Sequence, residues 1–283
     1  TGGAPAETRI DKILVELNDV LLASPFDLHI SAAIAANAPN FDLKTRIGPL
    51  PIGQENPPPP QVAYIKLKMA DVHLASFAPY VPADAPVALA TAQVSADLEV
   101  TDPLAKSGKI TSKGTFAVKQ IAFGLKQRGA PFDLTLTPNF TLDPKAGAVD
   151  LTGFSLALND MKFLAGGKVT GLTEGKPAFD ALTLKTENVD LGRVFEALPD
   201  AAAGLPKGAT VKGPLALDAT ATGDATNQRV ALALSLDGAT IVLPGKFEKG
   251  PGTPLNTRFD AEIAAQKDLK LNSFHVALGD INL

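Results

Sequence analysis

The sequence predicts a mainly β protein: an elongated, curled antiparallel sheet built from about two tandem repeat units, with two β-sandwich domains as the alternative. Apolar and polar residues alternate over short segments such as 65–69, 132–136 and 182–185. A period of two gives a strand one apolar and one polar face. Turn-forming clusters separate these segments, and the chain holds 24 Gly and 23 Pro. This spacing is typical of many short antiparallel strands.

Helical patterning is confined to two short stretches, near 74–80 and near 191–203. Each follows a strand-like segment, and residues 65–82 align with residues 182–199 in the same strand-then-helix order. The alignment predicts a first β repeat unit over residues 1–141 and a second over 142–283, which ends at the start of a third. Repeats of this kind stack along one axis and share a continuous apolar face.

A second repeated element has the form Leu-x-Asp within alternating apolar residues. It occurs three times, as Leu17 with Asp19, Leu158 with Asp160, and Leu278 with Asp280. Three aspartates gathered in space could bind calcium. Because each stands alone before an apolar residue, a role at a turn or strand end is the stronger interpretation.

Composition excludes several classes of partner. Lys and Arg number 26 against 30 Asp and Glu, and the basic residues are spread singly, so we expect no nucleic-acid partner. Without Cys there is no disulfide, thiolate nucleophile or thiolate metal site. No apolar run approaches the roughly 20 residues of a spanning helix. The chain starts at Thr1 without Met, so we expect a segment of a longer protein, which would reach a membrane only through an anchor outside this sequence.

The sequence contains no recognisable catalytic constellation. His29, His73 and His275 are isolated from one another, and no Gly-x-Ser-x-Gly motif occurs. A glycan-binding cleft is disfavoured because the chain has no Trp and only 2 Tyr. We therefore predict no enzyme activity, no cofactor and no metal.

Three stretches resemble the periplasmic region of AsmA-like proteins, the group that includes the TamB-type envelope proteins of diderm bacteria. They are residues 17–30 with 41–50, the segment Val-Asp-Leu-Gly-Arg-Val-Phe at 189–195, and the glycine-bracketed strand at 212–223. The resemblance implies a periplasmic location, an inner-membrane anchor in the intact protein, and a long β groove. By this resemblance the groove would bind or conduct the acyl chains of phospholipid, or of another acyl-chain lipid, between membranes for outer-membrane biogenesis and lipid homeostasis.

Alternation identifies the residues that would line such a groove, because the apolar residues at every second position point to one side of their strand. The candidates are Ile65, Leu67, Met69, Phe116, Val118, Phe154, Leu156, Leu158, Leu182, Leu184, Leu232, Leu234 and Leu236. The same pattern would also suit the closed core of a sandwich. In that case the chain is a structural, assembly or adhesion module with envelope proteins as partners and no lipid ligand.

Overall fold

The fold is known from a computed structural model that describes residues 8–20, 24–50, 61–82, 84–106, 108–124, 129–264, 268–279 and 281–282. Asp280 of the third Leu-x-Asp element lies outside these residues.

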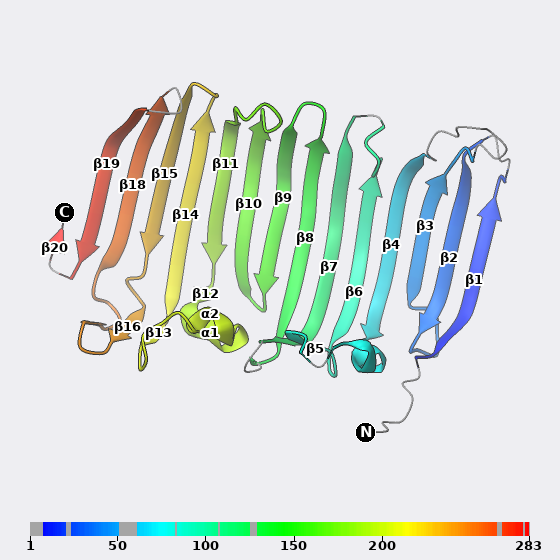
Figure 1. The fold of residues 1–283 in the computed structure, drawn as a ribbon, viewed down its shortest axis with the longest axis horizontal. Coiled ribbons are helices and arrows are strands. Elements are labelled where there is room, and N and C mark those ends of the chain that lie inside the picture. The colour runs from blue at the N-terminus through cyan, green and yellow to red at the C-terminus, as the bar shows by residue number, and fades with distance from the viewer. Residues whose placement is uncertain are drawn as a thin grey trace.

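Strands make up most of the chain (Figure 1). The first half contains β1 (Ile10–Asn18), β2 (Phe26–Ile34), β3 (Phe41–Ile47), β4 (Val62–His73), β5 (Val87–Ala88), β6 (Gln93–Thr101), β7 (Ile110–Phe123) and β8 (Phe132–Asp143). The second half contains β9 (Ala148–Leu158), β10 (Met161–Thr170), β11 (Ala178–Glu187), β12 (Val189–Asp190), β13 (Thr210–Lys212), β14 (Pro214–Gly223), β15 (Asn227–Ser235), β16 (Thr240–Leu243), β17 (Phe247–Lys249), β18 (Leu255–Ala264), β19 (Asp268–Leu278) and β20 (Ile281–Asn282). The prediction of a mainly β chain is confirmed.

The long strands form one antiparallel sheet in which almost every strand pairs with its neighbour along the chain. The order is β1, β2, β3, β4, β6, β7, β8, β9, β10, β11, β14, β15, β18, β19 and β20. β5 lies beside β7, β12 lies beside β14, and β13, β16 and β17 form a small separate sheet. The paired long strands follow one another along the chain. Most are joined by hairpins, and longer connections join β4 to β6, β11 to β14, and β15 to β18.

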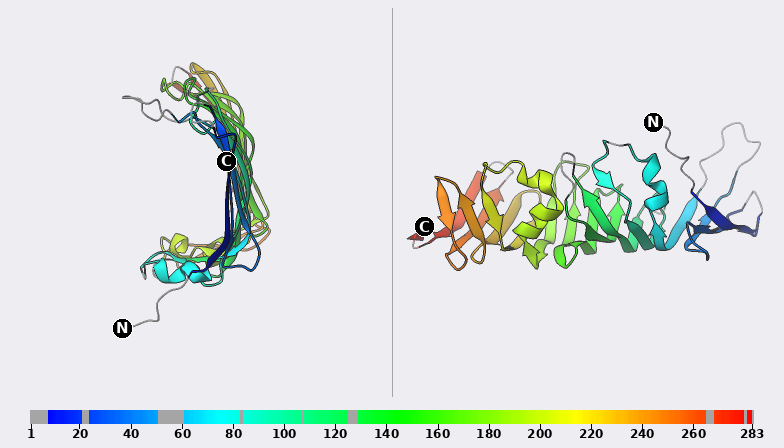
Figure 2. Two further views of the ribbon diagram at one scale, coloured as in Figure 1. Left: turned by 90° about the vertical axis from the view of Figure 1, so that its right-hand side faces the viewer. Right: turned by 90° about the horizontal axis from the view of Figure 1, so that it is seen from below.

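The long sheet is a single layer, so the two-sandwich alternative is wrong for the described residues. It is open and not strongly curled, which corrects the stronger curl expected from the sequence. Seen end-on, its strands bow toward one side (Figure 2). A single layer leaves each face free to meet solvent or a ligand over a large area.

The helices occur where the sequence predicted them, as η1 (Ala75–Tyr80), a 3₁₀ helix, and as α1 (Leu191–Ala197) with α2 (Pro199–Ala202). Asp190 caps α1, since its carboxylate accepts a hydrogen bond from the Arg193 N–H at 3.2 Å. All three helices lie at the lower edge of the sheet, on the inside of its bow (Figures 1 and 2).

The two helical connections are alike in detail. η1 lies between the adjacent strands β4 and β6, and α1 lies between β11 with β12 and β14. Val72 and Val189 precede the helices, each 2% exposed, and each follows a residue with positive φ, Asp71 and Asn188. The division of the chain into two units of about 140 residues stays a prediction.

The threefold Leu-x-Asp element is not one structural unit. Leu158 and Leu278 end strands at the lower edge and pair across tight hairpins with Met161 and Ile281. Leu17 lies one residue before the end of β1, which is at the upper edge instead (Figure 1). Leu158 and Leu278 thus occupy corresponding places in their strands, and Leu17 does not.

Candidate functional site

The candidate site is the side of the long sheet that carries the apolar half of each alternating strand, here called the apolar face. Directly paired residues of antiparallel strands point to the same side. One such row contains Met69, Ala96, Phe116, Leu136, Leu156 and Phe163. Another row contains Ala165, Leu184, Ala219, Leu232, Phe259 and Phe274. The rows cross from strand to strand, so the apolar face is continuous along the sheet.

The opposite side, here called the polar face, carries the charges. Ion pairs connect neighbouring strands there, including Lys185 with Asp218 at 3.1 Å and Lys66 with Glu99 at 3.5 Å. A hydrogen bond from Lys113 holds the pKa of Glu99 below its usual value. From β2 to β18, every charged residue in the described strand registers of the long sheet belongs to this face. The apolar face is therefore uncharged across these registers.

The lower part of the apolar face is covered by the helical connections. A buried cluster forms there from strand residues such as Ile121, Phe132 and Met161, together with Val189 and Ala197. Higher on the strands no second layer covers the apolar face among the described residues (Figure 2). The face is thus closed along the helix-bearing edge and open above it.

The structure brings the nominated residues together. Twelve of the thirteen lie in strands of the long sheet on the apolar face, while Leu236 follows the end of β15 and donates its N–H to the Leu255 carbonyl at 2.9 Å. Val118 and Leu158 are buried in the helix-covered cluster. The others are partly exposed, and Leu184 is 43% exposed. The same alternation could have found Leu136, Phe163 and Phe259, which sequence reasoning missed.

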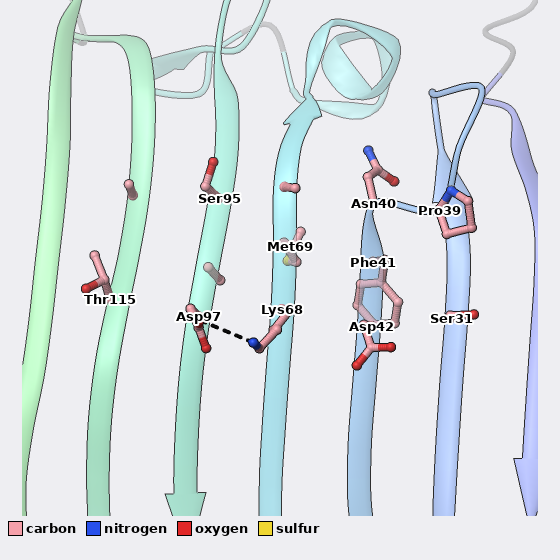
Figure 3. A pocket seen from close by; sticks show the side chains of 13 residues that line it. Ser31, Pro39, Asn40, Phe41, Asp42, Lys68, Met69, Ser95, Asp97 and Thr115 are labelled. Carbon is pink, nitrogen blue, oxygen red and sulfur yellow. Dashed lines mark ion pairs between the residues drawn. The ribbon is translucent and has the colours of Figure 1, made fainter.

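A shallow depression of about 600 Å³ lies on the polar face over β2, β3, β4, β6 and β7 (Figure 3). Its floor is made largely of small side chains, among them Ser31, Ser95 and Thr115. The ion pair between Lys68 and Asp97, 3.6 Å apart, crosses it (Figure 3).

His29 bridges the first three strands on the polar face. Its Nδ1 lies 2.8 Å from Glu16 Oε2 on β1, and its Nε2 lies 2.6 Å from Asp42 Oδ2 on β3. The hydrogen bond to Asp42, and then that to Glu16, raises the pKa of His29. Within the described part of the chain, no three His, Asp or Glu side chains are placed to hold a metal ion.

These features define the class of this protein: a single-layer antiparallel β protein with one uncharged and one ion-paired face. No protein-family model, curated protein or solved structure matches the chain. The described helices are all too short or too polar to cross a bilayer.

Proposed function

We propose that this chain is a periplasmic segment of an AsmA-like envelope protein, and that its apolar face binds phospholipid acyl chains. One observation carries the proposal: an uncharged face continues from β2 to β18 and is uncovered above the helices. Burial of apolar surface yields about 25 cal/mol per Å². Soluble proteins rarely expose large contiguous apolar patches unless a ligand or partner covers them. The sequence resemblance supports a lipid as that ligand.

The size of the face supports the same ligand. β7 has 14 residues, so it rises roughly 45 Å at 3.3 Å per residue. The acyl chains of one leaflet span only about 15 Å, half the hydrocarbon core of a bilayer. An acyl chain therefore fits along a strand above the buried cluster. In this proposal lipids enter at the edge without helices, and neither a cofactor nor a catalytic residue takes part.

Site-specific photo-crosslinking tests the proposal. A photoreactive amino acid replaces Leu184 or Leu234 on the apolar face, and in the matched control it replaces Leu164, which faces Lys185 on the polar face. We expect crosslinks to phospholipid at the first two positions and none at Leu164. Native mass spectrometry of the gently purified chain should show bound phospholipid. If no lipid co-purifies and no position crosslinks, the acyl-chain proposal is wrong.

A second candidate function is an assembly module without a lipid ligand. The observation that favours it is the concentration of exposed apolar side chains on the two outermost long strands, β1 and β19. An edge of this kind is a template for another strand. The two functions are compatible, because a sheet extended at its edges also extends its apolar face.

A further inference from the structure

A shallow trough runs along β15 on the polar face. The residues of β15 on this side are small, Ala231, Ala233 and Ser235, and longer side chains of β14 and β18 stand beside them. Two hollows of about 420 and 330 Å³ lie along the trough, and both are lined by Ala233 and Arg258. Since β15 pairs with β14 on one side and with β18 on the other, both walls of the trough belong to described strands.

Arg258 stands on the β18 side of this trough, across β15 from Asp218. Asp218 pairs with Ala233, and Ala233 pairs with Arg258. Neighbouring strands lie about 4.8 Å apart, so the backbones that carry the two charged residues are roughly 9.6 Å apart. Ala233 fills little of the space between them, and both hollows open there. The trough therefore has room for a side chain that comes from outside the chain.

The guanidinium of Arg258 is exposed and binds no carboxylate. Five arginines lie in the described residues, and each of the other four forms an ion pair with an aspartate. These pairs are Arg9 with Asp11, Arg46 with Asp27, Arg193 with Asp160, and Arg229 with Asp260. Arg258 alone has no ion pair or side-chain hydrogen bond within the described part of the chain.

The carboxylates beside Arg258 are already bound by other groups. Asp260 lies two residues further along β18 on the same side, and it accepts a hydrogen bond from Arg229 Nε at 3.0 Å. This bond holds the pKa of Asp260 below its usual value. Across the trough, Asp218 binds Lys185 at 3.1 Å.

A third carboxylate, that of Asp237, lines the lower end of the trough. It accepts the Leu255 N–H at 2.8 Å and the side-chain N–H of Asn256 at 3.1 Å. The hydrogen bond from Leu255 lowers the pKa of Asp237. Arg258 is thus the one charged group lining the described trough that lacks a partner.

The chemistry of Arg258 selects a carboxylate as the missing partner. A guanidinium presents a planar fork of N–H donors that matches the two oxygens of a carboxylate. Arg229 binds Asp260 in this way on the same face, through Nε and one Nη. A phosphate dianion is less suitable, because three carboxylates around the trough repel a second negative charge.

The shape of the trough favours a protein as the source of that carboxylate. Sites for small molecules usually enclose 70–90% of the ligand surface, and a shallow trough cannot do so. A protein partner covers a shallow site with its own surface, and Arg is among the residues enriched in protein interfaces.

We propose that this trough is an interaction surface for a partner protein, which places one Asp or Glu side chain over Ala233 and binds its carboxylate to Arg258. The ion pairs of Lys185 with Asp218 and of Arg229 with Asp260 remain on either side as a polar rim. The surface lies on the face opposite to the one proposed for acyl chains, so the two proposals stand or fall separately.

Nitrogen-15 NMR of the full chain tests the proposal through the Nε–H signals of its arginines. The probe is the peptide Ala-Ala-Glu-Ala-Ala with both ends blocked, and the control peptide has Gln in place of Glu. Arg46 is the internal control, because it lies on the polar face but is bound to Asp27 at 3.0 Å. We expect a saturable shift at Arg258 with the Glu peptide, and binding about tenfold weaker with the Gln peptide.

Three results of the titration overturn the proposal: no shift at Arg258, equal shifts at Arg46 and Arg258, or equal binding of the two peptides. Sodium acetate distinguishes a free acid from a protein side chain. If acetate binds as tightly as the Glu peptide, the trough is a site for small carboxylates and the protein interface is wrong.

Substitution of Arg258 gives a second test. Arg258→Gln should weaken binding of the Glu peptide about tenfold, while the matched Arg46→Gln leaves it unchanged. Arg258→Glu should bind a blocked peptide with Lys at the central position in preference to the Glu peptide. Circular dichroism shows that each variant is folded, and folded Arg258 variants that retain the Glu peptide overturn the proposal.

Discussion

Replacing Leu184 by Asp separates an open apolar face from a covered one. Leu184 lies on β11 between Ala165 and Ala219, and it is 43% exposed. Full burial of a Leu side chain stabilises a fold by about 1.5–3 kcal/mol. Just over half of Leu184 is buried, so the substitution should cost about 1–2 kcal/mol. A carboxylate at this place stays hydrated, and the domain should remain folded because typical stabilities are about 5–15 kcal/mol.

Lipid capture should respond far more strongly than stability. An acyl chain lying across position 184 would have to dehydrate the new carboxylate, which costs several kcal/mol. Two further variants serve as controls. Leu164→Asp, on the neighbouring strand but on the polar face beside Lys185, should cost a similar amount of stability and leave lipid binding intact. Leu158→Asp, at a position only 7% exposed, buries an unpaired carboxylate in the helix-covered cluster and should unfold the domain.

The measurements are a thermal melt of each variant and native mass spectrometry of its bound phospholipid. Equal destabilisation by Leu184→Asp and Leu158→Asp would refute the open face, because it would mean that position 184 is covered in solution. A folded Leu184→Asp that retains as much lipid as Leu164→Asp would refute acyl-chain binding on this face.

Three further perturbations test the framework of the sheet. Hydrogen bonds to two carboxylates raise the pKa of His29 in the folded protein. The stability that protonated His29 gives the fold is therefore fully present below about pH 6.5 and is lost as pH rises through the raised pKa. The melting temperature should fall over that pH range in the native chain and stay flat in His29→Gln. Gly114→Ala should lower the free energy of unfolding in urea by about 1–3 kcal/mol, because φ is +121° and the new Cβ would lie 2.0 Å from a backbone oxygen of β6. Gly175→Ala, where nothing lies within 4 Å of the new Cβ, should lower it less. Equal losses of stability in the two variants would contradict this reasoning. In the native chain the buried ammonium group of Lys249 donates to three carbonyl oxygens at 2.8–3.1 Å. Lys249→Met leaves these oxygens without a donor, so the free energy of unfolding, measured by thermal melt, should fall by about 2–5 kcal/mol. An unchanged melting temperature would show that the carbonyls find other donors.

Strand content and the two faces of each strand could be predicted from the sequence. Alternation is a property of neighbouring residues, and successive side chains of any strand point to opposite sides. Leu182 and Leu184 therefore share a face whatever the strand pairs with. The helices near 75–80 and 191–202 could be predicted for the same reason, since their signal is also local.

Polar contacts between strands could not be predicted. Glu16 and Asp42 each lie 13 residues from His29 along the chain, and only the pairing of β1, β2 and β3 brings them to the same imidazole. Pro138 lies inside β8, where a proline argues against a central strand. The pairing of β7 with β8 is interrupted near Pro138, and the N–H of Gly114 on β7 donates to the side-chain oxygen of Asn139 at 3.0 Å.

The sequence by itself determined that this chain forms strands with one apolar and one charged side. Only the tertiary structure decided what covers the apolar side. Leu158 and Leu184 stand in equivalent alternating patterns, yet the first is buried and the second exposed. The helical connections reach the buried cluster around Leu158, while Leu184 lies above them. Periodicity depends on adjacent residues, whereas coverage depends on which distant segments pack together, and no local pattern encodes that choice.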